Sequence, residues 1–492
     1  MLPTPSPDAA GALPRASARR AASAGLDGDT TASTMPLLTP STVSTTSTTV
    51  PAPSPTALAW VDEGVFTSGR STSTSWLADP DGDLLAERPR RSAFRPVILL
   101  PVAVVVLLVL AYVGGAAAWP LDAIRPQVSP TTVEGATAAA ATPAWPAQGS
   151  AAVAVDGFGA PLASTQNPST IASITKVVTA LMVLDQKPLK LGEQGPSYPM
   201  TSADAATYRR MLNAGESVLK VPVGSSMSEY QLLQGMLIGS AGNYAAKLAG
   251  SIWANDSDFA GAANVWLGQH GLSGISLVGP TGISKLNKAD PASLIPLGKL
   301  AMANPVIAEI VGTKSVTLPG AGLVQNTNEL LAEPGVVGIK TGTLDTYDLL
   351  AAKDVTVGDT KVRLYATALG QADDKKRIAA TDALFAELQK ELTPFTSVPK
   401  GTKVGTVTTK WGETVPIVTT SDADVVLWNG ATGTVATDFA LKDAATKGDK
   451  VGTLSVAGPV DKASTDVALA SDLDGPSLWW RLTHPLALLG AN

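Results

Sequence analysis

The sequence predicts an α+β fold, in which an antiparallel sheet and a helical lobe are followed by a small all-β domain. Helical and strand-like patterns alternate between residues 147 and 393, which is typical of a mixed domain. Short strand-like runs separated by turn residues then occupy residues 394–474. The length of 492 residues, more than one domain usually needs, agrees with two folded units and additional terminal segments.

The composition excludes several classes of protein. The chain has no cysteine, so it has no disulfide, no cysteine nucleophile and no cysteine-ligated zinc. Its two histidines, His270 and His484, are too few for a typical zinc peptidase site, and no G-x-S-x-G motif supports a Ser-His-Asp triad. We therefore expect neither a metal nor a cofactor. The formal net charge of −6, without a basic stripe, argues against a nucleic-acid partner.

The N-terminal region predicts a membrane anchor. Residues 1–93 are rich in Ser, Thr, Pro and Ala, and we expect them to form a disordered tail. Residues 97–119 carry no charge and are long enough for a transmembrane signal-anchor helix, the alternative being a buried core helix. Arginines before this segment place the tail in the cytoplasm and the rest of the chain outside the membrane. Residues 120–146, rich in Pro, Ala and Thr, are expected to form a linker.

The first candidate site is the S-x-x-K sequence from Ser173 to Lys176. It opens an almost wholly apolar segment that reaches Asp185 and predicts a buried helix. Residues i and i+3 share a helix face, so Lys176 can reach the Ser173 hydroxyl. Burial favours the neutral amine, which makes Lys176 a candidate general base. The alternative is a lysine that extends from a core helix to solvent.

The second candidate is Ser240, the first residue of a Ser-Ala-Gly-Asn sequence. It follows an amphipathic segment, residues 228–238, in which Ser228 and Gln231 predict a capping box at the start of a helix. We expect Ser240 on a tight turn between packed helices, where its hydroxyl can relay a proton. The alternative is an ordinary N-cap serine.

The third candidate is the K-T-G sequence of Lys340, Thr341 and Gly342. It lies in the first of three strand-like runs between residues 336 and 369, which predict an antiparallel meander. A lysine and a hydroxyl on this strand can hold a terminal carboxylate, and the glycine lets a ligand backbone approach closely. The alternative is a solvent-facing edge strand.

With the three motifs in this order and spacing, the chain from about residue 151 to 473 resembles the D-alanyl-D-alanine carboxypeptidases of the penicillin-binding protein family, the low-molecular-mass S11 peptidases. Residues 172–176, 279–283 and 338–342 carry the resemblance. It implies a penicillin-binding/β-lactamase-like catalytic domain at residues 147–393. Residues 394–474 are similar to the β-rich C-terminal domain of that family.

The resemblance implies an acyl-enzyme mechanism. Ser173 would attack the D-Ala-D-Ala carbonyl of a peptidoglycan stem peptide, Lys176 would take its proton, and Ser240 would relay a proton to the leaving D-alanine. Water would then hydrolyse the acyl-enzyme. β-Lactams would acylate Ser173 in the same way and leave slowly. The implied location is the bacterial cytoplasmic membrane, crossed once, with the catalytic domain outside.

The resemblance also implies the substrate-binding residues. Lys340 and Thr341 would bind the terminal carboxylate, on a strand that includes Gly342 and Thr343. The backbone amides of Ser173 and Thr343 would form the oxyanion hole, which is expected to contribute the largest electrostatic stabilisation.

The chain departs from the family in its second motif, S-x-N. Gly242 stands at the position that asparagine has in this motif, and Asn243 comes one residue later. Either Asn243 swings in from the next position and binds substrate, or the asparagine role is lost. Displacing a group that positions the substrate costs about a few kcal/mol.

The C-terminal segment, residues 475–492, resembles the terminal amphipathic segment of the family. Trp479 and Trp480 would lie in the outer membrane interface or pack on the β-rich domain. Two other functions stay open for the chain. A class A β-lactamase-like hydrolase would carry an E-x-x-N glutamate, which is absent between the second and third motifs. A catalytically weak, wall-binding scaffold protein is suggested by Gly242 alone.

Overall fold

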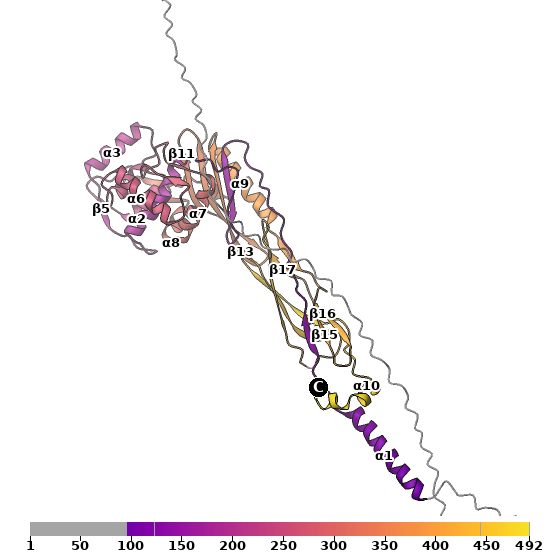
Figure 1. The fold of residues 1–492 in the computed structure, drawn as a ribbon. Helices are drawn as coiled ribbons and strands as arrows, with labels where there is room; N and C mark the ends of the chain where they lie inside the picture. The colour runs from indigo at the N-terminus through magenta and orange to yellow at the C-terminus, as the bar shows by residue number, and fades with distance from the viewer. Residues whose placement is uncertain (1–95, 123, 443, 492) are drawn as a thin grey trace, which may run out of the picture. The chain divides into compact units, whose positions relative to one another are not determined.

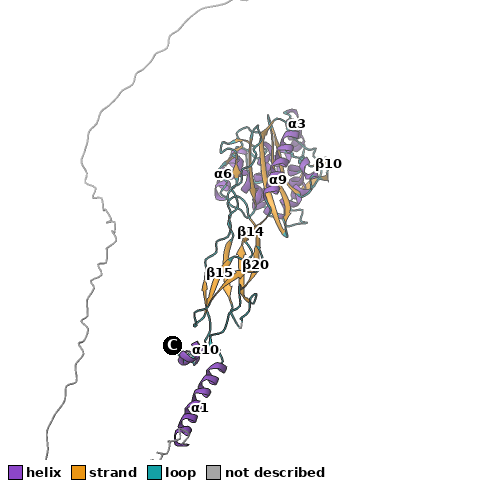
Figure 2. Cartoon of the chain, turned by 90° about the vertical axis from the view of Figure 1, so that its right-hand side faces the viewer, coloured by secondary structure: helices purple, strands orange, loops and turns teal. Residues whose placement is uncertain are grey.

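The computed structural model describes residues 96–122, 124–442 and 444–491 (Figure 1). The predicted tail, residues 1–93, lies outside these ranges. Within them the α+β prediction is confirmed, because a helix-covered antiparallel sheet precedes a domain built from strands. Figure 2 distinguishes these helices and strands by colour. We call residues 150–391 the helix-and-sheet domain.

The helix-and-sheet domain is organised around a five-stranded antiparallel sheet. Its strand order is β11-β12-β13-β2-β3. Strands β11 to β13 form the meander that the sequence predicts. Strand β2 comes much earlier in the chain and pairs with β13, with Val153 opposite Ala366. The strands are β2 (Ser150–Val155), β3 (Leu162–Ala163), β11 (Val336–Thr343), β12 (Tyr347–Val357) and β13 (Thr360–Gln371).

The two faces of this sheet pack against different helices. Ala152 and Ala154 of β2 belong to the core of the helical lobe, whereas Val153 and Val155 pack with helix α9 (Asp374–Glu391). This division follows from the two-residue period of a strand. Figure 1 shows α9 on one side of β11 and β13, with α2 (Thr175–Gln186), α7 (Pro291–Ala303) and α8 (Pro305–Gly312) on the other. Since both faces are covered, β2 is buried along its whole length.

The helical lobe is built from amphipathic and buried helices. The capping box predicted at Ser228 and Gln231 is confirmed at the start of α4, where each side chain accepts from the other residue's backbone N–H. The helices are α2 (Thr175–Gln186), α3 (Ser202–Asn213), α4 (Glu229–Leu237), α5 (Gly242–Ala249), α6 (Asp256–Gln269), α7 (Pro291–Ala303) and α8 (Pro305–Gly312), with single turns η1 (Ala172–Ile174) and η2 (Glu329–Ala332). Short strands, in one three-stranded sheet (β4-β8-β7) and two pairs (β5-β6 and β10-β9), connect them: β4 (Ser169–Thr170), β5 (Ser197–Pro199), β6 (Ser226–Ser228), β7 (Ile275–Ser276), β8 (Lys288–Ala289), β9 (Ser315–Leu318) and β10 (Gly322–Gln325).

The second domain is a β structure with its own apolar core, which includes Val404, Ile417, Val451 and Leu454. A six-stranded sheet has the order β1-β15-β16-β20-β19-β18, and β14 pairs with β17. Strand β1 belongs to residues 120–146, which were expected to form a linker. Part of this segment is therefore a strand of the sheet. The strands are β1 (Gln127–Pro130), β14 (Pro394–Val398), β15 (Lys403–Thr408), β16 (Thr414–Thr419), β17 (Ala423–Val426), β18 (Thr434–Phe439), β19 (Lys450–Ala457) and β20 (Lys462–Leu469).

Helix α1 (Pro96–Ala118) contains a segment, Leu99–Ala118, that is long and apolar enough to cross a membrane. The C-terminal segment forms α10 (Leu478–Thr483) and α11 (Pro485–Leu488). Trp480 makes an edge-to-face contact with Trp411 of the β15–β16 turn, whereas Trp479 is 74% exposed. Trp480 therefore packs on the β-rich domain, which is one of the two roles expected for this segment. Trp479 is exposed, as the other role, contact with the membrane interface, requires.

Candidate active site

Ser173 and Lys176 lie at the start of the buried helix that the sequence predicts. Ser173 is in the η1 turn, and Lys176 is one helical turn later in α2. Lys176 Nζ donates to Ser173 Oγ at 2.7 Å and to the Thr281 carbonyl oxygen at 2.5 Å. Lys176 is only 2% exposed, so it does not extend to solvent. The pair has the geometry of a hydroxyl nucleophile beside its base.

Burial changes the proton affinity of Lys176. It lowers the pKa of this lysine to about 7, because the charged ammonium loses its hydration. The carboxylate of Glu216 opposes this effect and favours the ammonium. A pKa near neutrality leaves much of the population with a free amine at pH 7. Lys176 can therefore accept a proton from the hydroxyl that it contacts.

The K-T-G strand passes beside the turn that holds Ser173. A Cβ on Gly342 would lie 2.8 Å from the carbonyl oxygen of Ile171, which precedes this turn, so only glycine lets β11 approach so closely. Ala172, directly before Ser173, adopts a left-handed conformation with φ of 43°. Such strained residues cluster at functional sites. The S-x-x-K and K-T-G motifs are thus brought together through close backbone contact.

Lys340 is buried within β11, and only 1% of its surface is exposed. Its Nζ donates to the Thr341 carbonyl at 3.2 Å and contacts the Thr341 hydroxyl at 3.4 Å. Burial, followed by the positive charges of Lys176 and Arg377, holds the pKa of Lys340 well below its usual range. An incoming carboxylate would reverse this effect by stabilising the ammonium. The site therefore suits an anionic ligand terminus better than a neutral one, and Lys340 is not the exposed edge-strand residue of the alternative reading.

The second motif lies between α4 and α5. Ser240 is buried and has a left-handed φ of 58°. Among the described residues, its hydroxyl has no hydrogen-bond partner. Thr327 links this junction to β11, because its N–H donates to the Ile238 carbonyl at 3.1 Å and its hydroxyl lies 2.6 Å from that of Thr341. The Ser240 turn is thus tied to the K-T-G strand.

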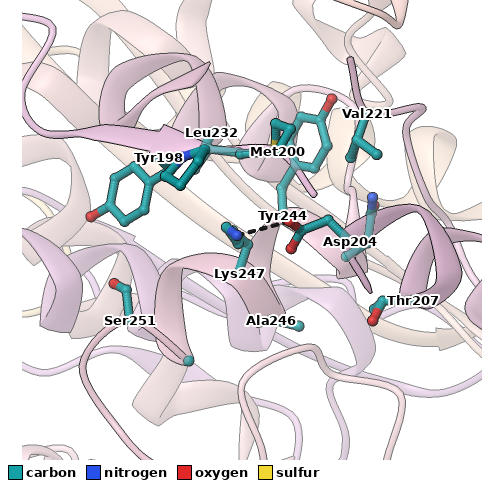
Figure 3. Close-up of a pocket in the computed structure, with 13 residues that line it drawn as sticks. Tyr198, Met200, Asp204, Thr207, Val221, Leu232, Tyr244, Ala246, Lys247 and Ser251 are labelled. Atoms are coloured by element: carbon teal, nitrogen blue, oxygen red, sulfur yellow. Dashed lines mark hydrogen bonds and ion pairs between the residues drawn. The ribbon is translucent and has the colours of Figure 1, made fainter. Parts of the chain in front are cut away.

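Asn243 is engaged away from this junction. Its side-chain amide donates to the Leu219 carbonyl at 2.8 Å and accepts from the Leu219 N–H at 3.1 Å. It also lines a cavity of about 310 Å³ that contains no residue of the S-x-x-K or K-T-G motifs. Figure 3 shows this cavity, crossed by the 2.9 Å ion pair between Lys247 and Asp204. Asn243, which follows Gly242, therefore binds the backbone of Leu219 rather than facing Lys176.

Two supporting residues carry no signal in the sequence. Arg377 of α9 donates to the Gly342 carbonyl at 2.9 Å and to the Thr343 hydroxyl at 3.0 Å, which fixes the end of β11. Asn287, which is fully buried, donates to Thr175 Oγ1 at 3.1 Å and to the Gly279 carbonyl at 3.0 Å, and accepts from the Val278 N–H at 2.8 Å. Asn287 thereby holds the loop of Thr281 against α2. Arg377 is distant in sequence from β11, and Asn287 is 112 residues from Thr175, so no local pattern identifies their roles.

Replacing Asn287 by alanine should disturb both folding and the Lys176 environment. The change leaves three buried polar partners unsatisfied, and we expect a loss of about 2–4 kcal/mol in the free energy of unfolding. It also frees the loop whose Thr281 carbonyl holds Lys176, so penicillin acylation should slow at temperatures where the variant remains folded. Denaturant unfolding and acylation rates check this expectation. Asn264→Ala, which removes similar bonds to Ala260 and Leu277 on an exposed part of the same lobe, should leave acylation unchanged.

Comparison with known proteins gives a family match over part of the chain. Residues 139–364 match the model of the Peptidase S11 family, D-alanyl-D-alanine carboxypeptidase. The D-alanyl-D-alanine carboxypeptidase DacB2 of Mycobacterium tuberculosis is 33% identical over 180 residues, which cover 35% of this chain and 57% of the relative. The D-alanyl-D-alanine endopeptidase of Pseudomonas aeruginosa is 31% identical over 193 residues, which cover 38% and 59%. The chain thus spans less than two thirds of the length of these curated relatives.

Among solved structures, penicillin binding protein 5 from Haemophilus influenzae is similar, with 19% identity and a TM-score of 0.47 over 68% of this chain and 99% of that one. The family match rests on the sequence of the helix-and-sheet domain, which includes all three motifs. Through residues 139–364, this chain is similar to the D-alanyl-D-alanine carboxypeptidase family of serine peptidases.

Proposed function

We propose that the protein is a serine-type D-Ala-D-Ala carboxypeptidase that removes the terminal D-alanine of peptidoglycan stem pentapeptides. The observation that carries this proposal is the 2.7 Å contact between Ser173 Oγ and the buried amine of Lys176, beside the carboxylate-binding strand β11. An amine with a pKa near 7 supplies the base that a serine hydroxyl needs at neutral pH.

The reaction begins when Ser173 Oγ attacks the carbonyl carbon of the D-Ala-D-Ala bond and its proton passes to Lys176. The amides of Ser173 and Thr343 hold the oxyanion that forms. The carbon–nitrogen bond then breaks, and the leaving amine of D-alanine takes a proton relayed through Ser240. Water adds to the resulting ester and releases the shortened peptide and Ser173. No redox partner or metal enters this balance.

Lys340 and Thr341 orient the substrate by binding its terminal carboxylate. Substrate binding brings a negative charge to a buried lysine whose ammonium is otherwise disfavoured. The strand end is held by Arg377, and Gly342 keeps β11 in contact with the Ser173 turn. This arrangement favours a peptide with a free carboxyl terminus over an internal peptide bond.

Helix α1 is proposed to anchor the protein in the bacterial cytoplasmic membrane, with a single crossing and the N-terminus in the cytoplasm. The segment Leu99–Ala118 has the required length and hydropathy, and arginines precede it. This orientation puts the helix-and-sheet domain outside the membrane, where peptidoglycan peptides and β-lactams are found. The partners are then the stem peptide as substrate and β-lactams as covalent inhibitors.

D-Alanine release tests the proposal directly. Purified full-length protein in detergent is incubated with a pentapeptide ending in D-Ala-D-Ala, and free D-alanine is measured alongside labelling by a fluorescent penicillin. We expect both D-alanine release and stable labelling. Rapid release of hydrolysed drug would indicate a β-lactamase instead. Absence of labelling and of D-alanine would favour a wall-binding scaffold and contradict the proposal.

The pH dependence of acylation follows from the pKa of Lys176. The amine acts as a base only when it is neutral, and burial lowers its pKa to about 7. The acylation rate should therefore fall as the pH drops below about 7 and approach a plateau above about 8. Stopped-flow measurements with a chromogenic penicillin give this midpoint. A midpoint near the ordinary lysine value would contradict a base whose pKa burial has lowered to about 7.

A further inference from the structure

Gly242 has no side chain at the asparagine position of the S-x-N motif, and another side chain occupies the space beside it. A Cβ placed on Gly242 would lie 3.3 Å from Glu216 Oε2, 3.3 Å from Met211 Cε and 3.4 Å from the Ser217 carbonyl oxygen. The Gly242 N–H donates to this same Ser217 carbonyl at 2.8 Å. A carboxylate from the segment after α3 therefore occupies the volume into which a side chain at position 242 would project.

The neighbouring asparagine cannot take this place without cost. Asn243 makes two hydrogen bonds to Leu219, three residues after Glu216. Turning its amide toward the first motif would leave the Leu219 N–H and carbonyl unsatisfied. The same bonds hold the 216–219 segment against the start of α5. Asn243 thus keeps the Glu216 carboxylate over Gly242 instead of replacing it.

Glu216 is electrostatically coupled to the proposed base. Its negative charge raises the pKa of Lys176, against the larger lowering that burial causes. In return, burial raises the pKa of Glu216, while the positive charges of Lys176 and Arg210 lower it. Two further charged groups belong to this network: Arg210 from α3 lowers the pKa of Glu216, and Lys340 from β11 has its own pKa lowered by the charge of Lys176.

We propose that Glu216 is a positioning residue of this active site, whose carboxylate takes the place at Gly242 that the asparagine side chain of the S-x-N motif occupies and balances the charge of Lys176. The inference rests on the proposed function for its link to catalysis. A carboxylate at this place differs from an amide in two respects: it carries charge, and it only accepts hydrogen bonds. It therefore stabilises the protonated form of Lys176, the state reached after Ser173 gives up its proton.

The charge-only variant Glu216→Gln tests this role. We expect the midpoint of the acylation–pH profile to shift to lower pH by on the order of half a unit to one unit, because the amine loses a stabilising negative charge. Glu216→Asp should keep the midpoint near that of the wild type. Glu193→Gln, an exposed acid in the same lobe that binds the Lys190 N–H, should not move it. An unchanged midpoint in Glu216→Gln would overturn the proposal.

A direct titration separates this proposal from the proposed function. The ¹³Cε resonance of Lys176 in lysine-labelled protein, assigned with Lys176→Met, reports its pKa without any turnover. A lower Lys176 pKa in Glu216→Gln supports the coupling even if the wild type releases no D-alanine, an outcome that would defeat the carboxypeptidase assignment alone. An unshifted resonance titration defeats the Glu216 proposal and leaves that assignment intact.

Substitutions at Gly242 and Glu216 test whether a side chain at position 242 would occupy the same space as the Glu216 carboxylate. Gly242→Asn places an amide against the Glu216 carboxylate, and we expect it to reduce acylation at least about tenfold because the contact is too close. Combining it with Glu216→Ser removes the competing carboxylate and should recover most of the lost rate. Equal rates in Gly242→Asn and in the double variant would show that the two side chains do not share one place.

Discussion

Replacing Ser173 by alanine should abolish both D-alanine release and penicillin labelling. Loss of a serine nucleophile lowers turnover by on the order of 10⁴- to 10⁶-fold, because no other group forms the acyl-enzyme. The fold should be retained, since the one side-chain hydrogen bond of Ser173 among the described residues is with Lys176. Mass spectrometry of the penicillin-treated protein and a D-alanine assay check this expectation, with thermal unfolding as the measure of folding.

Ser225→Ala serves as the matched control for this change. Ser225 also lies in the helical lobe, where its hydroxyl donates to the Pro222 carbonyl at 2.8 Å. Penicillin should label the Ser225→Ala variant at the wild-type rate. Stoichiometric labelling of Ser173→Ala, with the wild-type mass increase, would place the nucleophile elsewhere and remove the basis of the proposed mechanism.

Replacing Lys176 by methionine should reduce acylation nearly as much as loss of the nucleophile. Methionine has a similar length but no proton acceptor, so Ser173 keeps its place and loses its base. Its apolar side chain also suits the buried site, and the variant should fold. The acylation rate should fall by on the order of 10³-fold or more at every pH, and the inflection near pH 7 should disappear.

The double variant Ser173→Ala/Lys176→Met should be no less active than Ser173→Ala alone. Groups that act as one unit are non-additive, because the base has no function without the hydroxyl. Lys187→Met at the end of α2 provides the control: this lysine contacts Tyr198 and Ser251, and its loss should leave acylation intact. A Lys176→Met variant that kept the wild-type rate and pH profile would exclude Lys176 as the base.

Local patterns in the sequence predicted several elements of the helix-and-sheet domain. The three strand-like runs between residues 336 and 369 correspond to β11, β12 and β13. The apolar run at 151–155 is strand β2, but its pairing with β13 was not predictable, because pairing across such a distance leaves no local pattern. The segment from Ser173 to Asp185 was predicted as one helix, and it begins instead with the η1 turn before α2.

Some residues of the candidate site could be identified from the sequence, and others only from the structure. The S-x-x-K spacing alone indicated that Lys176 reaches Ser173, because i and i+3 residues share a helix face. The sequence also identified the missing asparagine at Gly242, but not what occupies its place. Glu216 and Asn287 reach the site from segments that carry no motif, and their roles depend on how distant loops pack.

By itself, the sequence determined the fold class, the three motifs, their order and the family that residues 139–364 resemble. These properties follow from hydrophobic periodicity and short spacings, which act over a few residues. Only the tertiary structure decided that Asn243 binds Leu219, that Glu216 lies over Gly242 and that Arg377 fixes the end of β11. Such contacts join segments far apart in the chain, and they form because buried polar groups must find partners wherever the packed fold provides them.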